Sequence, residues 1–298
     1  MTSDWIAFVN TVFVPVGLML IMFSMGLTLA LRDFAGAVRG GRLVTAGFAT
    51  HLLVLPLLGL AVGALFQLPP QLALGLFIIS ICPAGTTSNA LTFVGRGNVA
   101  LAVILTALTS LATVFTIPLL LSWAIPWFLS DGGGKVPELS VGNTILQLAR
   151  ITLLPIVVGM IVRHFAPEVA TKMARWLRPT AFIVLLGVIG FSVAISLEMV
   201  LRNALAVAPA IYVLNLLATG FGLLIGRVLG ASSRDAMTLA IETGVQNATL
   251  AIFLTLTVLD SLPLAVTQNV YGVIMLLNAT LLIRWFRPRV AAEEAQRT

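Results

Sequence analysis

Two short stretches of this chain combine helix breakers with hydrogen-bonding side chains inside long apolar runs. They are Cys82-Pro83-Ala84-Gly85-Thr86-Thr87-Ser88-Asn89 and Glu242-Thr243-Gly244-Val245-Gln246-Asn247. Proline removes a backbone donor, and glycine permits the angles that open a helix. An opened helix has free carbonyls at the end of its first half, which attract cations, and free amides at the start of its second half, which attract anions. The stretches therefore predict neighbouring sites for a cation and an organic anion.

Glu242 is the only acidic residue deep inside an apolar run. A charge at that depth costs about 2.5–3.5 kcal/mol on insertion scales, so the carboxylate needs a cation, a polar cavity or a proton. We predict a cation ligand or a titrating carboxylate; the alternative is a protonated Glu that hydrogen-bonds between helices. Neutral oxygens of the kind that hard cations prefer come from Ser88, Asn89, Thr106, Gln246 and Asn247. For any single Ser, Thr or Asn of this group, Thr106 included, the alternative role is a helix-packing hydrogen bond.

His51 lies within the second apolar run and is a candidate proton carrier or cation-site neighbour, with an interhelical hydrogen bond as the alternative. The single cysteine, Cys82, excludes a disulfide framework and a zinc site built on several thiolates. An intramembrane enzyme using Glu242 and His51 would need a nucleophile or a metal cluster, and two histidines with one cysteine offer neither. We therefore predict no catalytic residue and no enzymatic activity.

The composition indicates an all-α polytopic membrane protein. Of 298 residues, 59% are hydrophobic and 9% are charged, against about 25% charged in soluble domains. A span needs about 20 apolar residues, and the chain is expected to form one transmembrane domain over residues 1–298. The apolar runs predict nine spans, near residues 6–31, 43–66, 72–94, 99–128, 142–163, 179–198, 204–227, 236–258 and 263–285.

The basic residues predict the orientation. Fourteen of the 17 Lys and Arg residues fall in one set of alternate loops, Lys135 and Arg202 fall in the other set, and Arg150 lies within a run. The positive-inside rule then places the N-terminus outside and the C-terminus in the cytoplasm, with a short tail at 287–298. This bias also explains the net charge of +6 without a nucleic-acid partner. The first run lacks a basic leader and is too long for a cleavable signal peptide, so we expect a retained span in the cell membrane, the inner membrane in a bacterium.

The two polar stretches are similar to each other. Ser88-Asn89-Ala90-Leu91 parallels Gln246-Asn247-Ala248-Thr249, and the two spans run in opposite directions. This arrangement is typical of inverted repeats with a discontinuous helix in each half, a recurring transporter plan. We predict one repeat over about 1–128 and a second over about 141–286.

Four motifs resemble the bile acid:sodium symporter family and its bacterial homologues. Besides the two stretches above, they are Met22-Phe23-Ser24-Met25-Gly26-Leu27-Thr28-Leu29 and Arg96-Gly97-Asn98-Val99-Ala100-Leu101. The motifs span most of the chain. The resemblance implies a core domain with two crossed broken helices, a panel domain beside it, and a nine-span form with four plus five helices.

The resemblance also implies the site residues. One sodium site would use Ser88, Asn89, Thr106 and Glu242, and a second would use Glu242, Gln246 and backbone carbonyls around Thr243 and Val245. Substrate would lie near Thr86 and Asn247, with Asn278 and Thr280 of the last span as further candidates. Two departures stand out: Ala102 replaces a hydroxyl that the family often has at the first site, and His51 replaces a glutamine that often serves the second.

We therefore predict a secondary active transporter that couples sodium to symport of a small or amphipathic organic anion, bile-acid-like or another carboxylate, by alternating access. The coupling ion is Na⁺, with H⁺ as the alternative that His51 raises. Metalloid or anion efflux, with Cys82 as the reactive group, is a further alternative. A sensor would need a signalling domain, and no run of 50 or more polar residues exists to form one. The expected partners are the substrate and the lipid bilayer, with no obligate protein partner.

Overall fold

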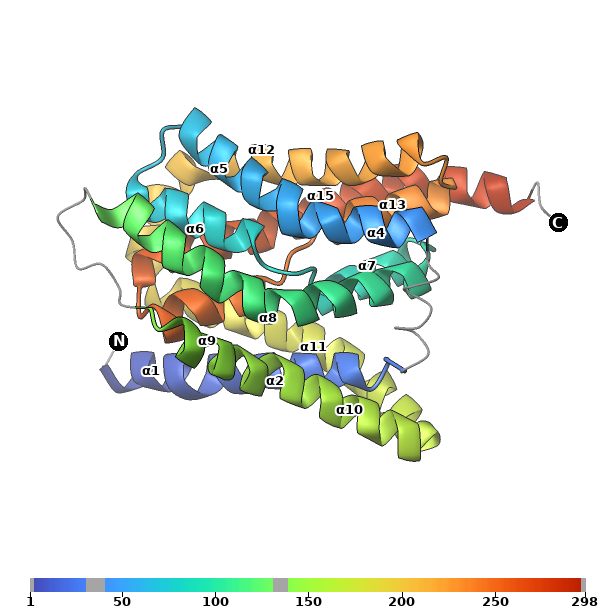
Figure 1. Cartoon of the computed structure of the whole chain (residues 1–298), viewed down its shortest axis with the longest axis horizontal. Coiled ribbons are helices and arrows are strands. Elements are labelled where there is room, and N and C mark those ends of the chain that lie inside the picture. Colours follow the sequence, from blue (N-terminus) through green and yellow to red (C-terminus); the bar gives the residue numbers. More distant parts are fainter. Residues whose placement is uncertain (1–2, 31–40, 131–138, 296–298) are drawn as a thin grey trace.

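The computed structural model describes residues 3–30, 41–130 and 139–295. Within these ranges the chain is helical, and its one strand-like feature is an isolated β-bridge. Most helices run along the long axis of the molecule, with α1 at one end and the last turns of α15 at the other (Figure 1). The helices are α1 (Ser3–Phe8), η1 (Val9–Phe13), α2 (Val14–Gly26), α4 (Gly41–Ala49), η2 (Thr50–Val54), α5 (Leu55–Leu65), α6 (Pro70–Ser80), α7 (Thr86–Val94), α8 (Val99–Leu129), α9 (Val141–Leu148), η4 (Ala149–Leu153), α10 (Leu154–Phe165), α11 (Pro167–Ile195), α12 (Leu197–Val228), α13 (Ser233–Gly244), α14 (Ala248–Phe253), η5 (Leu254–Val258) and α15 (Leu262–Ala295).

Several helices are long and apolar enough to cross a bilayer. In the described residues these are Ile6–Gly26, Gly41–Leu65, Val99–Leu129, Val141–Phe165, Leu197–Val228 and Leu262–Glu293, and the bent pair Pro167–Leu177 with Pro179–Ile195 adds a seventh if it forms one span. Large apolar side chains cover the outside of the bundle: Leu205 is 87% exposed and Phe165 is 79% exposed. Such a surface is suited to hydrocarbon. The chain is an all-helical polytopic membrane protein.

Two predicted spans, 72–94 and 236–258, are each interrupted. The first divides into α6 and α7 around residues 81–85, and the second into α13 and α14 around residues 245–247. The backbones of the two breaks pair: the amide of Gly85 donates to Val245 O at 3.2 Å, and the amide of Asn247 donates to Pro83 O at 2.9 Å. An antiparallel bridge joins Ala84 to Gln246 between them. Each break therefore satisfies backbone groups that the other leaves free.

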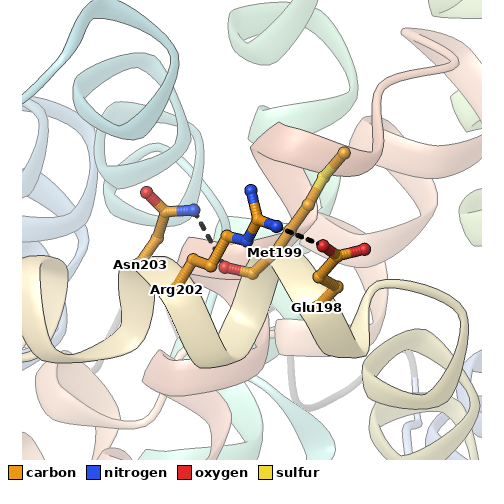
Figure 2. Close-up of polar contacts among 4 residues, drawn as sticks. All are labelled: Glu198, Met199, Arg202 and Asn203. Carbon is orange, nitrogen blue, oxygen red and sulfur yellow. Dashed lines mark hydrogen bonds and ion pairs between the residues drawn. The ribbon is translucent and has the colours of Figure 1, made fainter.

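Some helix boundaries differ from the predicted ones. The first span ends at Gly26 instead of 31, because a turn follows it. The predicted loop at 199–203 lies within α12, whose first turn holds Glu198. Arg202 pairs with Glu198 one turn away, and Asn203 Nδ2 donates to Met199 O at 2.9 Å (Figure 2). These polar residues extend the helix beyond the apolar run. Similarly, α15 continues to Ala295, past the predicted start of the tail. Arg32, Arg39, Lys135 and Arg297, which enter the orientation prediction, lie outside the described residues.

Three long helices contain a π-helical turn directly before a proline. η1, η2 and η4 precede Pro15, Pro56 and Pro155, which lie at the start of α2, α5 and α10. Proline has no N–H to donate, so the ordinary hydrogen-bond ladder is broken there, and the wider turn absorbs the change. The turn in η2 carries His51.

Small residues let α12 approach α13 closely. A Cβ atom at Gly222 would lie 2.4 Å from Thr243 Oγ1, and one at Gly226 would lie 2.7 Å from Ala236 Cβ. The two glycines are four residues apart and share a helix face, as in the small-residue contacts of membrane helices. This contact holds the helix that carries Glu242 against its neighbour.

Candidate functional site

Glu242 lies at the end of α13, close to both breaks, and its side chain is fully buried. Its carboxylate receives two hydroxyl hydrogen bonds from different helices. Ser88 Oγ, on α7, donates to Oε1, and Thr106 Oγ1, on α8, lies 2.9 Å from Oε2. The structure therefore brings together the acidic residue and two of its predicted partners.

Asn89 adds a fifth oxygen to this group. Its Oδ1 lies 3.4 Å from Thr106 Oγ1. The carboxylate, two hydroxyls and an amide oxygen form an oxygen-only donor set, which fits a hard cation such as Na⁺. Ala102 contributes no side-chain oxygen; its carbonyl accepts from Thr106 Oγ1 at 3.0 Å. In the described part of the chain, no cluster of three or more His, Cys, Asp or Glu residues is placed to hold a metal, so any cation here depends on neutral oxygens around one carboxylate.

The second predicted set lies across the break in α13 and α14. Gln246 Nε2 donates to Thr243 O at 2.6 Å, and Val245 O accepts from Gly85 N at 3.2 Å. Gln246 Oε1 is buried and has no hydrogen-bond partner within the described residues. Both carbonyls are thus held by protein donors, while the one unpartnered oxygen of the set belongs to Gln246.

His51 reaches this region from η2. It is buried, its Nδ1 lies 3.0 Å from Gly47 O, and its Nε2 lies 3.1 Å from the backbone oxygen of Glu242. A neutral imidazole has one N–H to donate, so it can satisfy only one of these two acceptors. The histidine is therefore both an interhelical contact and a direct neighbour of the carboxylate residue.

A cavity of about 470 Å³ lies beside the start of α7. Thr86, Thr87 and Asn89 line it from the first turn of that helix. Gly85 precedes this turn and supplies no side-chain cap, so the first backbone amides of α7 have no capping side chain. The remaining lining residues are Ser24, Met25, Thr28, Ala90, Phe93, Val94, Val99, Val103, Pro179, Ala181 and Phe182. The cavity is therefore mainly apolar, with polar groups gathered at a helix N-terminus.

Asn247 faces a different and narrower gap, which it shares with Pro83 and Ser110. Its Oδ1 caps α14 by accepting from Leu250 N at 3.0 Å. Asn247 Nδ2 and Ser110 Oγ are buried without hydrogen-bond partners among the described residues. Asn247 thus lies at the start of α14, as Thr86 lies at the start of α7, but the two residues line separate spaces.

Asn278 belongs to a buried network that the sequence analysis did not identify. Its Nδ2 donates to Asn215 Oδ1 at 2.8 Å. Asn215 Nδ2 and Tyr271 Oη both donate to Gly244 O, at 2.7 and 3.0 Å. Asn215 and Tyr271 are polar residues in the middle of apolar spans, and that position was the sequence signal that could have identified them. Thr280 lies apart: it is exposed and donates to Leu276 O of its own helix.

Asn98 connects the start of α8 to the start of α13. Its Oδ1 caps α8 through Leu101 N at 3.1 Å, and its Nδ2 donates to Asp235 Oδ1 at 2.8 Å. The amide of Asn98 also donates to Thr238 Oγ1 at 2.8 Å. Two helices that supply oxygens to the Glu242 group are therefore fixed to each other at one end.

Several known proteins are similar in sequence to this chain over most of its length. The chain is 31% identical over 239 residues to the probable sodium/metabolite cotransporter BASS1, chloroplastic, of Arabidopsis thaliana, covering 80% of this chain and 58% of that protein. It is 28% identical over 292 residues to the uncharacterized sodium-dependent transporter YocS of Bacillus subtilis, covering 98% and 87%. It is 28% identical over 239 residues to the human ileal sodium/bile acid cotransporter, covering 78% and 66%.

The chain spans 58% and 63% of the lengths of BASS1 from Arabidopsis thaliana and from rice. The sequence model described as the sodium bile acid symporter family matches residues 15–203, which is more than half of the chain. This match includes the first broken helix and the helices that carry His51, Ser88, Asn89 and Thr106. The chain belongs to the sodium bile acid symporter family.

Proposed function

We propose that this protein is a secondary active transporter that couples Na⁺ to symport of a small or amphipathic organic anion by alternating access. The observation that carries the proposal is the fully buried carboxylate of Glu242. It accepts hydrogen bonds from hydroxyl groups on α7 and α8, and it lies beside the two helix breaks, whose backbones pair with each other. A lone buried carboxylate among oxygen donors is suited to exchange a cation with solvent. The names of the relatives, sodium cotransporters, support the choice of Na⁺.

The first cation site is formed by Glu242, Ser88, Asn89 and Thr106. When Na⁺ enters, the two hydroxyls turn their lone pairs toward the ion and donate elsewhere. Thr106 Oγ1 already lies 3.0 Å from Ala102 O, and Ser88 Oγ lies 2.7 Å from Gly85 O. Both therefore have a second acceptor in reach, so the carboxylate can change partners without leaving a buried donor unpaired.

The second cation site centres on Gln246. Rotating its amide by half a turn exchanges Nε2 for Oε1 and places an oxygen next to Thr243 O. Two carbonyl-type oxygens at that separation repel each other unless a cation lies between them. With sodium bound, the ion therefore holds Gln246 and Thr243 O together, whereas without sodium the hydrogen bond from Nε2 does so.

The organic anion binds in the 470 Å³ cavity with its carboxylate at the first turn of α7. The described residues that line the cavity include no charged side chain, so the amides of Thr86 and Thr87 and the helix dipole receive the negative charge. The apolar lining, including Phe93 and Phe182, accepts the rest of an amphipathic molecule. Coupling follows because Ser88 and Asn89 lie in the same turn of α7 that faces the anion.

The proposed architecture has nine spans in inverted repeats of four and five helices, over about 1–128 and 141–286. One layer of α2, α10 and α11, the panel, lies below α5, α6, α12, α13 and α15, the core, in Figure 1. With the N-terminus outside and the C-terminus in the cytoplasm, the cavity lies on the cytoplasmic side and the narrow gap at Asn247 lies toward the outside. This supports an inward-facing arrangement in the cell membrane.

Proton coupling is the second candidate, and one observation favours it. His51 faces two carbonyl oxygens, and only the imidazolium form can donate to both. Under this alternative a proton on His51 replaces one of the sodium ions.

A ligand-stabilisation screen tests the proposal. Purified protein is unfolded thermally with a panel of organic carboxylates in Na⁺ and in K⁺. An anion that binds the native state raises the melting temperature by mass action, and the gain should require Na⁺. Ala90→Trp, which fills the cavity, should abolish the gain from the anion. Ala206→Trp, on an exposed face of α12 outside the cavity, should preserve it. A gain that is equal in K⁺ would contradict sodium coupling, and a gain that survives Ala90→Trp would contradict the cavity assignment.

A further inference from the structure

A second, separate cavity is lined in part by the last turns of α15. These turns lie at one end of the molecule (Figure 1). The cavity measures about 340 Å³ and is enclosed by the end of α12, the start of α13 and α15. Its lining includes Arg227, Ser233, Trp285 and Arg289. None of these residues belongs to the Glu242 group or to the proposed anion cavity.

Neither arginine in this cavity has a salt-bridge partner among the residues that the structure describes. The one salt bridge within the described residues is the exposed pair Glu198–Arg202 on the opposite half of α12. Glu293 lies near Ser233, but its carboxylate accepts from the Ser233 amide at 3.1 Å and from the Ser233 hydroxyl. That carboxylate caps the start of α13 instead of pairing with a guanidinium. The cavity therefore presents two guanidinium groups without a salt-bridge partner among the described residues, and the Glu293 carboxylate lies beside them on Ser233.

Arg289 is oriented by aromatic rings. Its guanidinium carbon lies 4.1 Å from the centroid of the Trp285 ring and 5.5 Å from that of Phe286. Stacking fixes the plane of the guanidinium and leaves its N–H edge available for an anion. A planar, pre-oriented guanidinium is suited to bidentate contact with phosphate.

The approach to the cavity is apolar on both helices. On α15, Leu281 and Trp285 are 61% and 53% exposed and lie four residues apart on the face that ends at Arg289. On α12, Leu224 and Val228 are 51% and 74% exposed and flank Arg227. On α15 the exposed apolar stripe ends at Arg289, and on α12 exposed apolar residues lie beside Arg227. A free phosphate ion would use only the arginines, whereas a phospholipid would also use the stripes for its acyl chains.

We propose that this cavity binds the phosphate headgroup of an acidic phospholipid. Arg227 and Arg289 contact the phosphate, the hydroxyl of Ser233 lies at the same cavity, and the acyl chains lie along Leu281, Trp285 and Leu224. Basic pockets between transmembrane helices, with a tryptophan at the interface, have the chemistry that such headgroups require. The bound lipid would connect α12 and α15 with α13, which is the first half of the second broken span.

The test measures lipid retention by the full-length chain. Protein is purified from nanodiscs of phosphatidylglycerol or of phosphatidylcholine, and bound lipid is counted by native mass spectrometry. Arg227→Gln with Arg289→Gln should weaken phosphatidylglycerol retention by about tenfold or more, since hydrogen bonds to charged groups contribute the most. The matched control is Arg284→Gln with Arg287→Gln, which removes the same charge from exposed positions of α15 outside the cavity. It should retain phosphatidylglycerol as the unmodified protein does.

A further variant separates the cavity from its charge. Ala231→Leu narrows the cavity with a larger side chain while keeping both arginines, and it should also weaken lipid retention. Equal retention by the two double variants would overturn the proposal, because the lipid would then respond only to net charge. Retention of phosphatidylcholine equal to that of phosphatidylglycerol would also overturn it. So would displacement of the lipid by millimolar inorganic phosphate, which would make the site one for free phosphate. Thermal stabilisation by Na⁺ in each variant verifies that the fold is intact.

Discussion

Replacing Glu242 with glutamine removes the charge from the proposed cation site and leaves its shape. The glutamine keeps one oxygen to accept from Ser88, and its amide nitrogen can donate to Thr106 Oγ1, whose own proton can go to Ala102 O. The variant is therefore expected to fold. In K⁺ its stability should equal or exceed that of the unmodified protein, because a buried carboxylate no longer has to be desolvated.

The loss of sodium affinity follows from the charge. A carboxylate and a monovalent cation about 4 Å apart attract by about 4 kcal/mol at an effective dielectric constant of about 20. If half of that attraction survives as net affinity, Glu242→Gln weakens sodium binding by about 2 kcal/mol, roughly 30-fold. At a sodium concentration of about 100 times the original dissociation constant, stabilisation by Na⁺ should fall from about 2.7 kcal/mol to about 0.9 kcal/mol.

Thermal unfolding in Na⁺ and in K⁺ at equal ionic strength measures this difference. The control is Glu198→Gln, which removes an exposed carboxylate from the pair with Arg202 (Figure 2) and does not touch the site. Its gain from Na⁺ should equal that of the unmodified protein. A full sodium-dependent gain in Glu242→Gln would refute the assignment of this carboxylate as the cation ligand.

Further substitutions test single contacts around the site. Thr106→Val should weaken sodium binding by about tenfold, whereas Thr109→Val, whose hydroxyl bonds within its own helix, should not; equal effects of the two on sodium titrations would contradict the ligand role. His51→Gln should tighten sodium binding, because the amide adds a neutral oxygen, and weaker binding by a folded variant would argue against the second site. Tyr271→Phe should lower thermal stability in K⁺ by about 1–2 kcal/mol, since Gly244 O then keeps only one of its two donors; unchanged stability would show that the network contributes little.

The positions of the two breaks could be predicted because their causes are local. Pro83 and Gly85 in the first span and Gly244 in the second favour an opened helix, and the breaks occur at or directly after those residues. Residue chemistry identified Ser88 and Thr106 as candidate oxygen donors, and the resemblance to the family grouped them with Glu242, a carboxylate that requires polar neighbours in an apolar span. The structure places all three within hydrogen-bond distance.

The direction in which a side chain points could not be predicted in the long apolar spans. The polar residues of α15 are spread around the helix and form no single polar face, so its sequence does not indicate which face is buried. Thr280 consequently lies exposed, while Asn278, two residues earlier, reaches Asn215 on another helix. The contact between Asn215 and Tyr271 depends on helix packing across 56 residues of sequence. Helix rotation of this kind is set by tertiary packing, which no local pattern encodes.

The backbone pairing between the breaks has a consequence for biosynthesis. Pro83 O and Gly85 N find their partners at Asn247 and Val245, which the ribosome adds about 160 residues later. Until then, the first break has no partner strand, and hydrocarbon offers it no water-like substitute. We therefore expect the first broken segment to stay in the insertion machinery or at the headgroup boundary until the second is made, and to insert into the hydrocarbon region only together with it.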